Sequence, residues 1–128
     1  MNKILFDTDV MIAHLRDYAT VTSQIAELHQ KGCVLAYTPV SEAEIFRGLR
    51  SNERKRTENF LNQLVCLSLD QRIGRLAGEY LRRYSKSHGL EIPDALIAAS
   101  AVIHRFALCT FNWKHYPMSE IERFHLDH

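Results

Sequence analysis

Three acidic residues occur in apolar surroundings, where a charged side chain needs a specific partner. Asp7 ends the apolar run ILFD, Glu44 lies within AEIF, and Asp94 stands in PDALI. The acids of NERKRTEN, by contrast, belong to a charged segment that is typical of a solvated helix face. Carboxylates that gather away from water raise one another's pKa unless a cation lies between them. The pattern therefore indicates a divalent metal ion as the partner.

The residue types around these acids favour a hard metal ion and phosphate chemistry. Carboxylate oxygens without a Cys or His spacing typical of zinc suit Mg²⁺ or Mn²⁺. Such an ion activates water and offsets charge on a phosphate during phosphodiester hydrolysis. The sequence has no Gly-rich phosphate loop and no evident Ser-His-Asp or Cys-His arrangement. These absences weaken the other common hydrolytic mechanisms.

Each acid taken alone has a simpler explanation. Asp7 could cap the helix that follows it, and Asp94 could favour the positive end of its own helix. Glu44 on an amphipathic helix could form a surface salt bridge. The metal interpretation therefore depends on all three acids occurring in order and in matching contexts.

Short apolar segments alternate with amphipathic ones, which predicts strands alternating with helices. We expect strands at residues 3–6, 33–38 and 65–69, a fourth strand that runs into a turn within 105–113, and helices at 8–17, 20–32, 41–50, 52–64, 70–89 and 93–103. This order favours an α/β, three-layer single domain over residues 1–128, with a parallel sheet covered on both faces. Residues 124–128 are either a short edge strand or a tail.

The three acids are expected to meet at one edge of this sheet. Sites in parallel sheets form outside the carboxyl ends of the strands, where Asp7 and the helix carrying Glu44 both follow a strand. Pro93 suits the first position of a helix, which places Asp94 in its first turn. Ile97, Ala98 and Ala101 continue that side of the helix, so Asp94 should face protein.

Composition excludes several classes of protein. The 16 basic and 15 acidic residues nearly cancel to +1, so any nucleic-acid contact must use a local patch. Cys33, Cys66 and Cys109 are odd in number and lie in apolar stretches, which predicts buried thiols in a reducing cytosol. No apolar run approaches the length of a membrane span, so we expect a soluble, cytoplasmic protein without membrane association.

The chain resembles the PIN-domain ribonucleases, and more narrowly the VapC-type toxins of toxin–antitoxin pairs. The matching segments are ILFDTDVMI, SEAEIFRGL, IPDALIAASA and LCTFNWKHYP, spread over nearly the whole chain. The resemblance implies a PIN-like α/β/α fold with a small, mainly parallel sheet, and Mg²⁺ or Mn²⁺ held by Asp7, Glu44 and Asp94. It also implies endoribonuclease activity, commonly on tRNA or ribosomal RNA, a VapB-type antitoxin partner and a homodimer within their complex.

One position departs from many relatives of this family. Where they carry a fourth acid after the last strand, this chain has Asn112, which offers a carbonyl oxygen but no charge. We therefore expect one tightly bound ion, with Asn112 as a secondary catalytic residue. Asp9 could assist Asp7, and Thr8 and Thr110 could orient water by hydrogen bonding.

Surface residues allow two interpretations each. The basic residues of RGLRSNERKR and LRRYSKSHG are either solvated or bind RNA phosphates. Trp113 and Tyr116 either cover the sheet edge or stack on a base, and His115 is a turn residue or an RNA contact. Apolar side chains on charged helices belong either to the core or to a groove that, in the family, receives the antitoxin; they are Phe46, Leu49, Phe60 and Leu64.

Two other functions compete with the nuclease. A PIN-like module could bind RNA or a protein without cutting, and the missing fourth acid keeps that alternative open. A small Mg²⁺-dependent phosphatase would cleave monoesters and ignore RNA, but this chain lacks the nucleophilic Asp context that the best-known phosphatase fold needs. Metal-dependent cleavage of RNA separates the nuclease from both.

Overall fold

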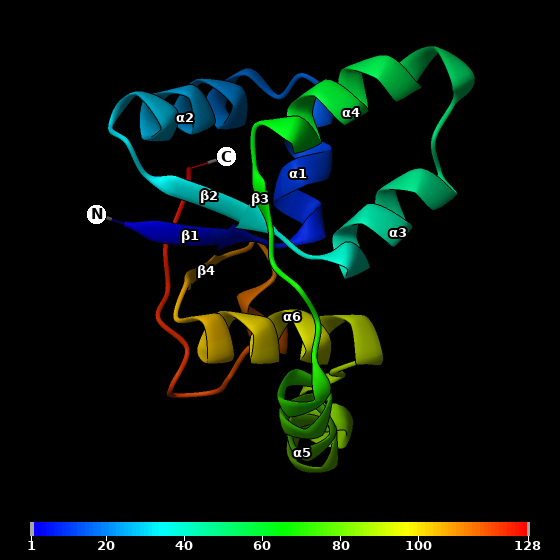
Figure 1. Cartoon of the computed structure of the whole chain (residues 1–128). Coiled ribbons are helices and arrows are strands. Elements are labelled where there is room, and N and C mark those ends of the chain that lie inside the picture. The colour runs from blue at the N-terminus through cyan, green and yellow to red at the C-terminus, as the bar shows by residue number, and fades with distance from the viewer. Residues whose placement is uncertain (1, 128) are drawn as a thin grey trace.

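A four-stranded, all-parallel sheet forms the middle of the computed structural model, which describes residues 2–127 (Figure 1). Its strands are β1 (Lys3–Phe6), β2 (Val34–Tyr37), β3 (Val65–Cys66) and β4 (Ala107–Cys109), in the order β3-β2-β1-β4. β1 therefore lies inside the sheet, and its Ile4 pairs with Leu35 on one side and Ala107 on the other. Because all pairs are parallel, the four strands end at the same edge, where the acids were expected.

Helices cover both faces of this sheet. They are α1 (Thr8–Leu15), α2 (Ala19–Gln30), α3 (Pro39–Arg47), α4 (Arg54–Asn62), α5 (Gln71–His88) and α6 (Ile92–His104), with short 3-10 helices η1 (Ser51–Glu53) and η2 (Trp113–His115). Figure 1 shows α1, α2 and α4 on one side of the sheet, and α6 backed by α5 on the other. The prediction of an α/β/α fold is confirmed, and the strand pairs are all parallel.

The alternation of side chains along β1 explains why two cores form. Leu5 points into the apolar layer under α6 and α5, whereas Ile4 and Phe6 point into the layer under α1, α2 and α4. All three side chains are fully buried. A strand that is covered on both faces is apolar at successive positions, as Ile4, Leu5 and Phe6 are. The two layers hold β1 rigidly and fix the position of Asp7 directly after it.

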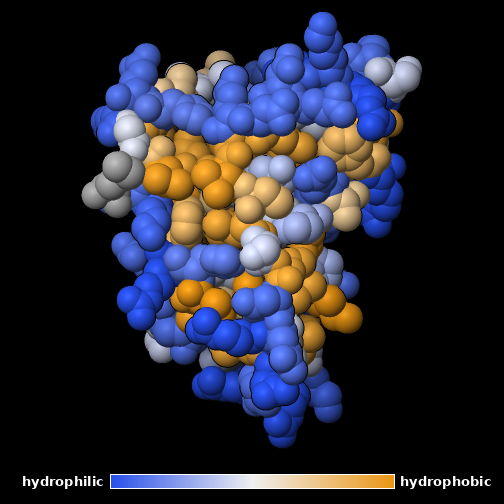
Figure 2. All heavy atoms as spheres, viewed as in Figure 1, coloured by the Kyte–Doolittle hydropathy of each residue, from blue (hydrophilic) through white to orange (hydrophobic). Residues whose placement is uncertain are grey.

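The edge strand β3 is shorter than its predicted form. The expected strand 65–69 pairs with β2 only through Val65 and Cys66, and both residues are exposed. Figure 2 shows the apolar residues in a band at the level of the sheet, between hydrophilic helices above and below. The prediction of three buried thiols is therefore wrong for Cys66, because β3 has a neighbour on one side only. Cys33 is half-buried and Cys109 is buried.

The boundaries of α5 agree with the expected capping residues. Oδ1 of Asp70 accepts a hydrogen bond from the backbone N–H of Ile73 at 3.0 Å. Gly89 ends the helix with φ of 65°, a left-handed conformation that glycine adopts without steric cost. The loop that follows leads directly into α6 and therefore toward Asp94.

The end of the chain forms a tail rather than an edge strand. Only an isolated bridge joins Leu108 to Arg123, and Asp127 N donates to Oε1 of Gln24 at 3.0 Å. His128, the last residue of the predicted segment, lies outside the described residues. Within residues 2–127, no helix is long and apolar enough to cross a membrane.

Candidate functional site

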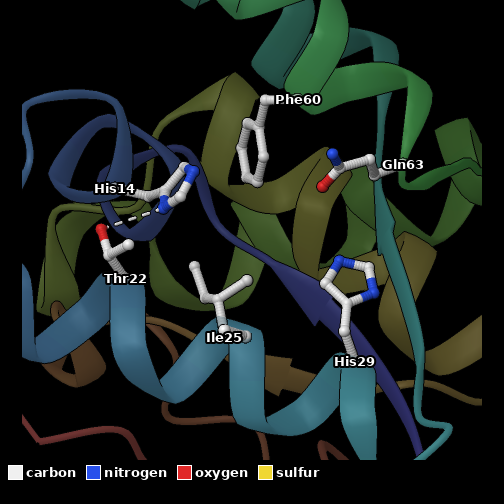
Figure 3. Close-up of a pocket in the computed structure, with 7 residues that line it drawn as sticks. His14, Thr22, Ile25, His29, Phe60 and Gln63 are labelled. Atoms are coloured by element: carbon white, nitrogen blue, oxygen red, sulfur yellow. Dashed lines mark hydrogen bonds between the residues drawn. The ribbon is translucent and has the colours of Figure 1, made fainter.

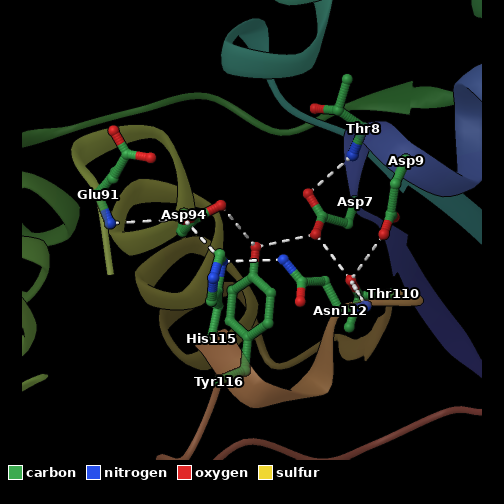
Figure 4. A network of polar contacts seen from close by, with 9 residues as sticks. All are labelled: Asp7, Thr8, Asp9, Glu91, Asp94, Thr110, Asn112, His115 and Tyr116. Atoms are coloured by element: carbon green, nitrogen blue, oxygen red, sulfur yellow. Dashed lines mark hydrogen bonds and ion pairs between the residues drawn. The ribbon is translucent and has the colours of Figure 1, made fainter. Parts of the chain in front are cut away.

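Asp7 lies at the carboxyl end of β1 and is 7% exposed. Its Oδ1 accepts a hydrogen bond from the backbone N–H of Thr8 at 2.8 Å. Asp7 is therefore the N-cap of α1, the role that the sequence offered as its simpler explanation. Its Oδ2 accepts hydrogen bonds from the hydroxyls of Thr110 at 2.8 Å and Tyr116 at 2.9 Å (Figure 4). One carboxyl oxygen thus serves the helix, and the other faces a polar cluster.

Asp94 reaches the same cluster from the first turn of α6. Its Oδ1 lies 3.4 Å from the Tyr116 hydroxyl, and its Oδ2 lies 3.4 Å from Nδ1 of His115. The backbone N–H of Glu91 donates to Oδ2 at 3.4 Å, which closes the helix N-terminus. The Asp94 side chain is 23% exposed, so it borders both the protein and the solvent.

The Tyr116 hydroxyl joins Asp7 and Asp94, which are far apart in the sequence. Tyr116 is fully buried. Burial, and then the charges of Asp7 and Asp94, raise the pKa of Tyr116, so the phenol stays protonated and able to donate. Stacking of Tyr116 on an RNA base is therefore excluded by its burial, and that alternative is wrong.

Glu44 is connected to Asp7 through Thr8. α3 begins at Pro39, two residues before the expected start, so Glu44 lies in its second turn. Oε1 of Glu44 accepts the Thr8 hydroxyl at 2.7 Å, and that hydroxyl also lies 2.8 Å from the hydroxyl of Ser41. Because Thr8 binds Asp7 with its N–H and Glu44 with its hydroxyl, one residue sets the position of both acids.

Asn112 approaches Asp94 only through His115. Its side-chain nitrogen lies 2.9 Å from Nδ1 of His115, and its backbone N–H donates to the Thr110 hydroxyl at 3.0 Å. Within the described chain, no hydrogen bond joins Asn112 directly to the three predicted acids. The structure therefore places Asn112 beside the cluster and one side chain away from Asp94.

Asp9 has a larger part in the cluster than its sequence position indicated. Its Oδ2 accepts the backbone N–H of Phe111 at 3.0 Å and the hydroxyl of Thr110 at 3.3 Å. Its Oδ1 is buried and has no hydrogen-bond partner among the described residues. Burial, as the largest cause, raises the pKa of Asp9. The sequence feature that indicates this role for Asp9 is the segment DTD, in which Asp7 and Asp9 are two residues apart and both lie at the beginning of α1.

The electrostatics of the cluster indicate a missing positive charge. Burial, followed by the charge of Asp9, raises the pKa of Asp7 to about 7, although three hydrogen bonds oppose this rise. The oxygen donors of the cluster and the unpartnered Oδ1 of Asp9 suit a hard divalent cation. In residues 2–127, no three His, Cys, Asp or Glu side chains converge into a complete ligand set. Mg²⁺ commonly needs only one or two carboxylates because it keeps several waters.

The basic residues after Glu44 are partly engaged within the protein. Arg56 forms an ion pair with Asp17 and donates to the carbonyl of Leu15 at 2.7 Å. Arg54 pairs with Glu58 at 3.4 Å. The contacts of Arg56 tie α4 to the end of α1, so Arg56 has a structural role in addition to any contact with RNA.

A separate pocket of about 580 Å³ lies between α1, α2 and α4 (Figure 3). Ile25 and Phe60 form apolar walls, and the rings of His14 and Phe60 stack with centroids 4.3 Å apart. Phe60 and Leu64 are buried, so these two predicted core-or-groove residues belong to the core, whereas Phe46 and Leu49 are half-buried. None of the clustered acids lines this pocket.

Comparison with known proteins supports the resemblance seen in the sequence. The family model described as "PIN domain" matches residues 4–121. The chain belongs to the PIN domain family. Ribonuclease VapC10 of Mycobacterium tuberculosis is 37% identical over 118 residues, which are 91% of this chain and 88% of that protein. Ribonuclease VapC19 of the same organism is 34% identical over 115 residues, or 89% and 92% of the two chains.

Solved structures share the fold of this PIN domain. VapBC2 from Rickettsia felis, bound to a DNA fragment from its promoter, aligns with a TM-score of 0.81 over 98% of this chain and 99% of that chain, at 20% identity. DNA-bound VapBC from Salmonella typhimurium aligns with a TM-score of 0.80 over 98% of both chains, at 16% identity. These similarities confirm the PIN-like fold, and PIN-domain ribonucleases generally depend on a divalent metal.

Proposed function

We propose that this PIN domain is a metal-dependent endoribonuclease that hydrolyses RNA phosphodiester bonds and acts as the toxin of a VapBC-type pair. The observation that supports this most is the joining of Asp7 and Asp94 by one buried hydroxyl at the carboxyl edge of the sheet. The VapC ribonucleases that resemble the chain over most of its length support the same activity.

Asp7, Asp94 and Glu44 are the residues that we propose as ligands of Mg²⁺ or Mn²⁺. Their oxygens have the chemistry that either ion prefers, and Asp9 adds a buried oxygen without a partner. Such an ion, when bound, supplies an activated water and offsets the charge on the reacting phosphate. With Asn112 in place of a fourth acid, we expect one ion to be bound tightly.

The residues of the chain contribute orientation around that ion. Thr8 holds the Oε1 atom of Glu44, and Thr110 holds the Oδ2 atom of Asp7, so neither carboxylate rotates freely. Nδ1 of His115 lies 3.4 Å from Oδ2 of Asp94, at the border with solvent, where the ring can form a hydrogen bond with a bound phosphate. Asn112 fixes the ring of His115, which is the secondary role that we assign to it.

We place the RNA across the C-terminal half of α5. This helix carries five of the 16 basic residues and one of the 15 acidic ones, so it has a charge of +4 while the rest of the chain has −3. Arg82, Arg83 and Lys86 are exposed near its end. A side chain at Gly89 would come within 3.8 Å of Nε2 of His115, so this end of α5 adjoins the acids. Basic side chains here would bind successive phosphates.

The partner that we propose is a VapB-type antitoxin bound to a homodimer of this chain in the cytoplasm, with tRNA or ribosomal RNA as the substrate. A groove of about 560 Å³ between α1, α3 and α4 is lined by apolar Ile12, Leu15 and Leu49 and by Glu44. An antitoxin segment in this groove would bring an arginine within reach of Glu44, Asp7 or Asp94 and so displace the ion.

Cleavage of a labelled total-RNA pool by purified protein, without antitoxin, tests the proposed function. Discrete fragments should form with Mg²⁺ or Mn²⁺ and disappear with EDTA or in the Asp94→Asn variant. RNA binding without any cleavage, in protein that is folded and binds metal, would instead favour a non-catalytic module.

A further inference from the structure

The hydroxyl of Tyr116 contacts two of the three predicted metal ligands, Asp7 and Asp94. It lies 2.9 Å from Oδ2 of Asp7 and 3.4 Å from Oδ1 of Asp94, although these residues are 109 and 22 positions away in the sequence. The two carboxylate oxygens are therefore no more than 6.3 Å apart. A single cation could contact both oxygens from that separation with small side-chain movements.

The contacts leave the hydroxyl with more acceptors than protons. A phenol has one proton to donate, and the shorter contact assigns it to Asp7. Asp7 Oδ2 also accepts the single proton of the Thr110 hydroxyl, so the hydroxyl protons of Thr110 and Tyr116 meet at one oxygen. Oδ2 of Asp7 is therefore held in place by two hydrogen bonds. Oδ1 of Asp94 has only the longer contact with the Tyr116 hydroxyl, which a cation could replace.

The surroundings of Tyr116 keep its hydroxyl at this position. The ring is fully buried in the core between the sheet and α6. The backbone N–H donates to the carbonyl of Trp113 at 2.9 Å, and the carbonyl accepts from the guanidinium of Arg123 at 3.1 Å. A side chain fixed at both its backbone and its ring presents a preorganised hydroxyl.

We propose that Tyr116 is a positioning residue for the metal site, whose hydroxyl holds Asp7 beside Asp94 so that both carboxylates can reach one divalent cation. The inference rests on the proposed function, because it assumes that these two carboxylates bind the metal. It goes further by assigning a role to a residue that is neither an acid nor a contact of the RNA.

Replacement of the hydroxyl alone tests the proposal, and Tyr80 provides a matched control. Tyr80 is 2% exposed, belongs to the same core, and its hydroxyl forms no hydrogen bond with Asp7, Glu44 or Asp94 among residues 2–127. We expect Tyr116→Phe to weaken Mn²⁺ binding by about tenfold to a hundredfold, the usual cost of losing a partner of a metal ligand. Tyr80→Phe, the same chemical change away from the acids, should leave the affinity unchanged.

Calorimetric titration with Mn²⁺ alone measures this affinity without RNA. In cleavage assays at limiting Mn²⁺, Tyr116→Phe should lower kcat and leave KM for RNA unchanged, which a general loss of packing would not do. Equal Mn²⁺ affinity in Tyr116→Phe and the wild type would overturn the role of Tyr116 while leaving the nuclease intact. A wild-type protein that neither binds Mn²⁺ nor cuts RNA would overturn the proposed function as well.

A second measurement uses the wild-type protein, in case Tyr116→Phe does not fold. Carbon-13 labelling of the tyrosine Cζ atoms reports the environment of each hydroxyl by NMR. Saturation with Mg²⁺ should shift the Tyr116 resonance and leave that of Tyr80 in place. Binding of Mg²⁺ without a shift at Tyr116 would contradict the proposal.

Discussion

Asp7 and Asp9 share the hydroxyl of Thr110, which lies 2.8 Å from Oδ2 of Asp7 and 3.3 Å from Oδ2 of Asp9. One hydroxyl proton cannot satisfy two carboxylates, and both side chains are largely withdrawn from water. Burial is the largest cause that raises the pKa of both acids, and the hydrogen bonds from Thr110 oppose that rise. The metal-free protein is therefore destabilised by the residues that would bind the metal.

The first prediction concerns the stability of the metal-free protein as a function of pH. The pKa of Asp7 is about 7 in the folded protein and 3.8 for an aspartate in water, so the unfolded chain loses this proton first as the pH rises. The free energy of unfolding should therefore fall between about pH 4 and pH 7 and stay low above it, by a few kcal/mol (~1.4 kcal/mol per pKa unit). The raised pKa of Asp9 also makes the free energy of unfolding fall as the pH rises.

Asp7→Asn should remove most of this pH dependence and make the metal-free protein more stable at pH 8. Asparagine keeps the N-cap at Thr8 and carries no charge. Urea unfolding with EDTA at pH 5 and pH 8 measures the effect, with Asp127→Asn, an exposed acid, as the control. If the free energy of unfolding of Asp7→Asn depended on pH as that of the wild type does, ionisation of Asp7 would not be a source of the pH dependence.

The second prediction is that Asp94→Asn abolishes metal-dependent cleavage and leaves the fold nearly intact. Asp94 is partly exposed, and asparagine can still accept the Glu91 N–H that closes α6. The rate should fall by more than about a hundredfold, beyond the usual cost of a residue that only supports a ligand. Single-turnover cleavage of RNA measures this fall, and Glu27→Gln, an exposed acid in α2, is the control. Full activity in Asp94→Asn would remove Asp94 from the mechanism.

The sequence predicted the acids of the site because parallel strands end at one edge. Asp7 follows β1 directly, and Pro93 fixes Asp94 in the first turn of α6, so local signals placed both. Tyr116 was missed as a member of the cluster because its position depends on the turn through η2, which no local pattern encodes. β3 was too long in the prediction because an apolar run does not reveal how many residues a neighbouring strand will pair.

The third prediction separates the two ends of α5 as RNA contacts. Arg82→Gln/Arg83→Gln should raise KM for RNA several-fold without changing kcat, because these residues lie toward the end that adjoins Asp94. Arg72→Gln/Arg75→Gln removes the same charge from the other end and should have little effect. Titrations of KM against salt should show a shallower slope, by about 0.7 per lost phosphate contact with single-stranded RNA, only in the first variant. Equal effects of both pairs would indicate a general electrostatic attraction instead.

The fourth prediction restores an acid at the position where the chain departs from many relatives. Asn112 contacts His115, and His115 contacts Asp94, so Asn112→Asp adds a carboxylate one side chain away from the cluster. The added charge should allow a second Mn²⁺ ion to bind, because a cation offsets the repulsion between neighbouring carboxylates. Calorimetric stoichiometry with Mn²⁺ measures this effect, and Asn62→Asp in α4 is the matched control. An unchanged stoichiometry in Asn112→Asp would mean that residue 112 does not bind metal itself.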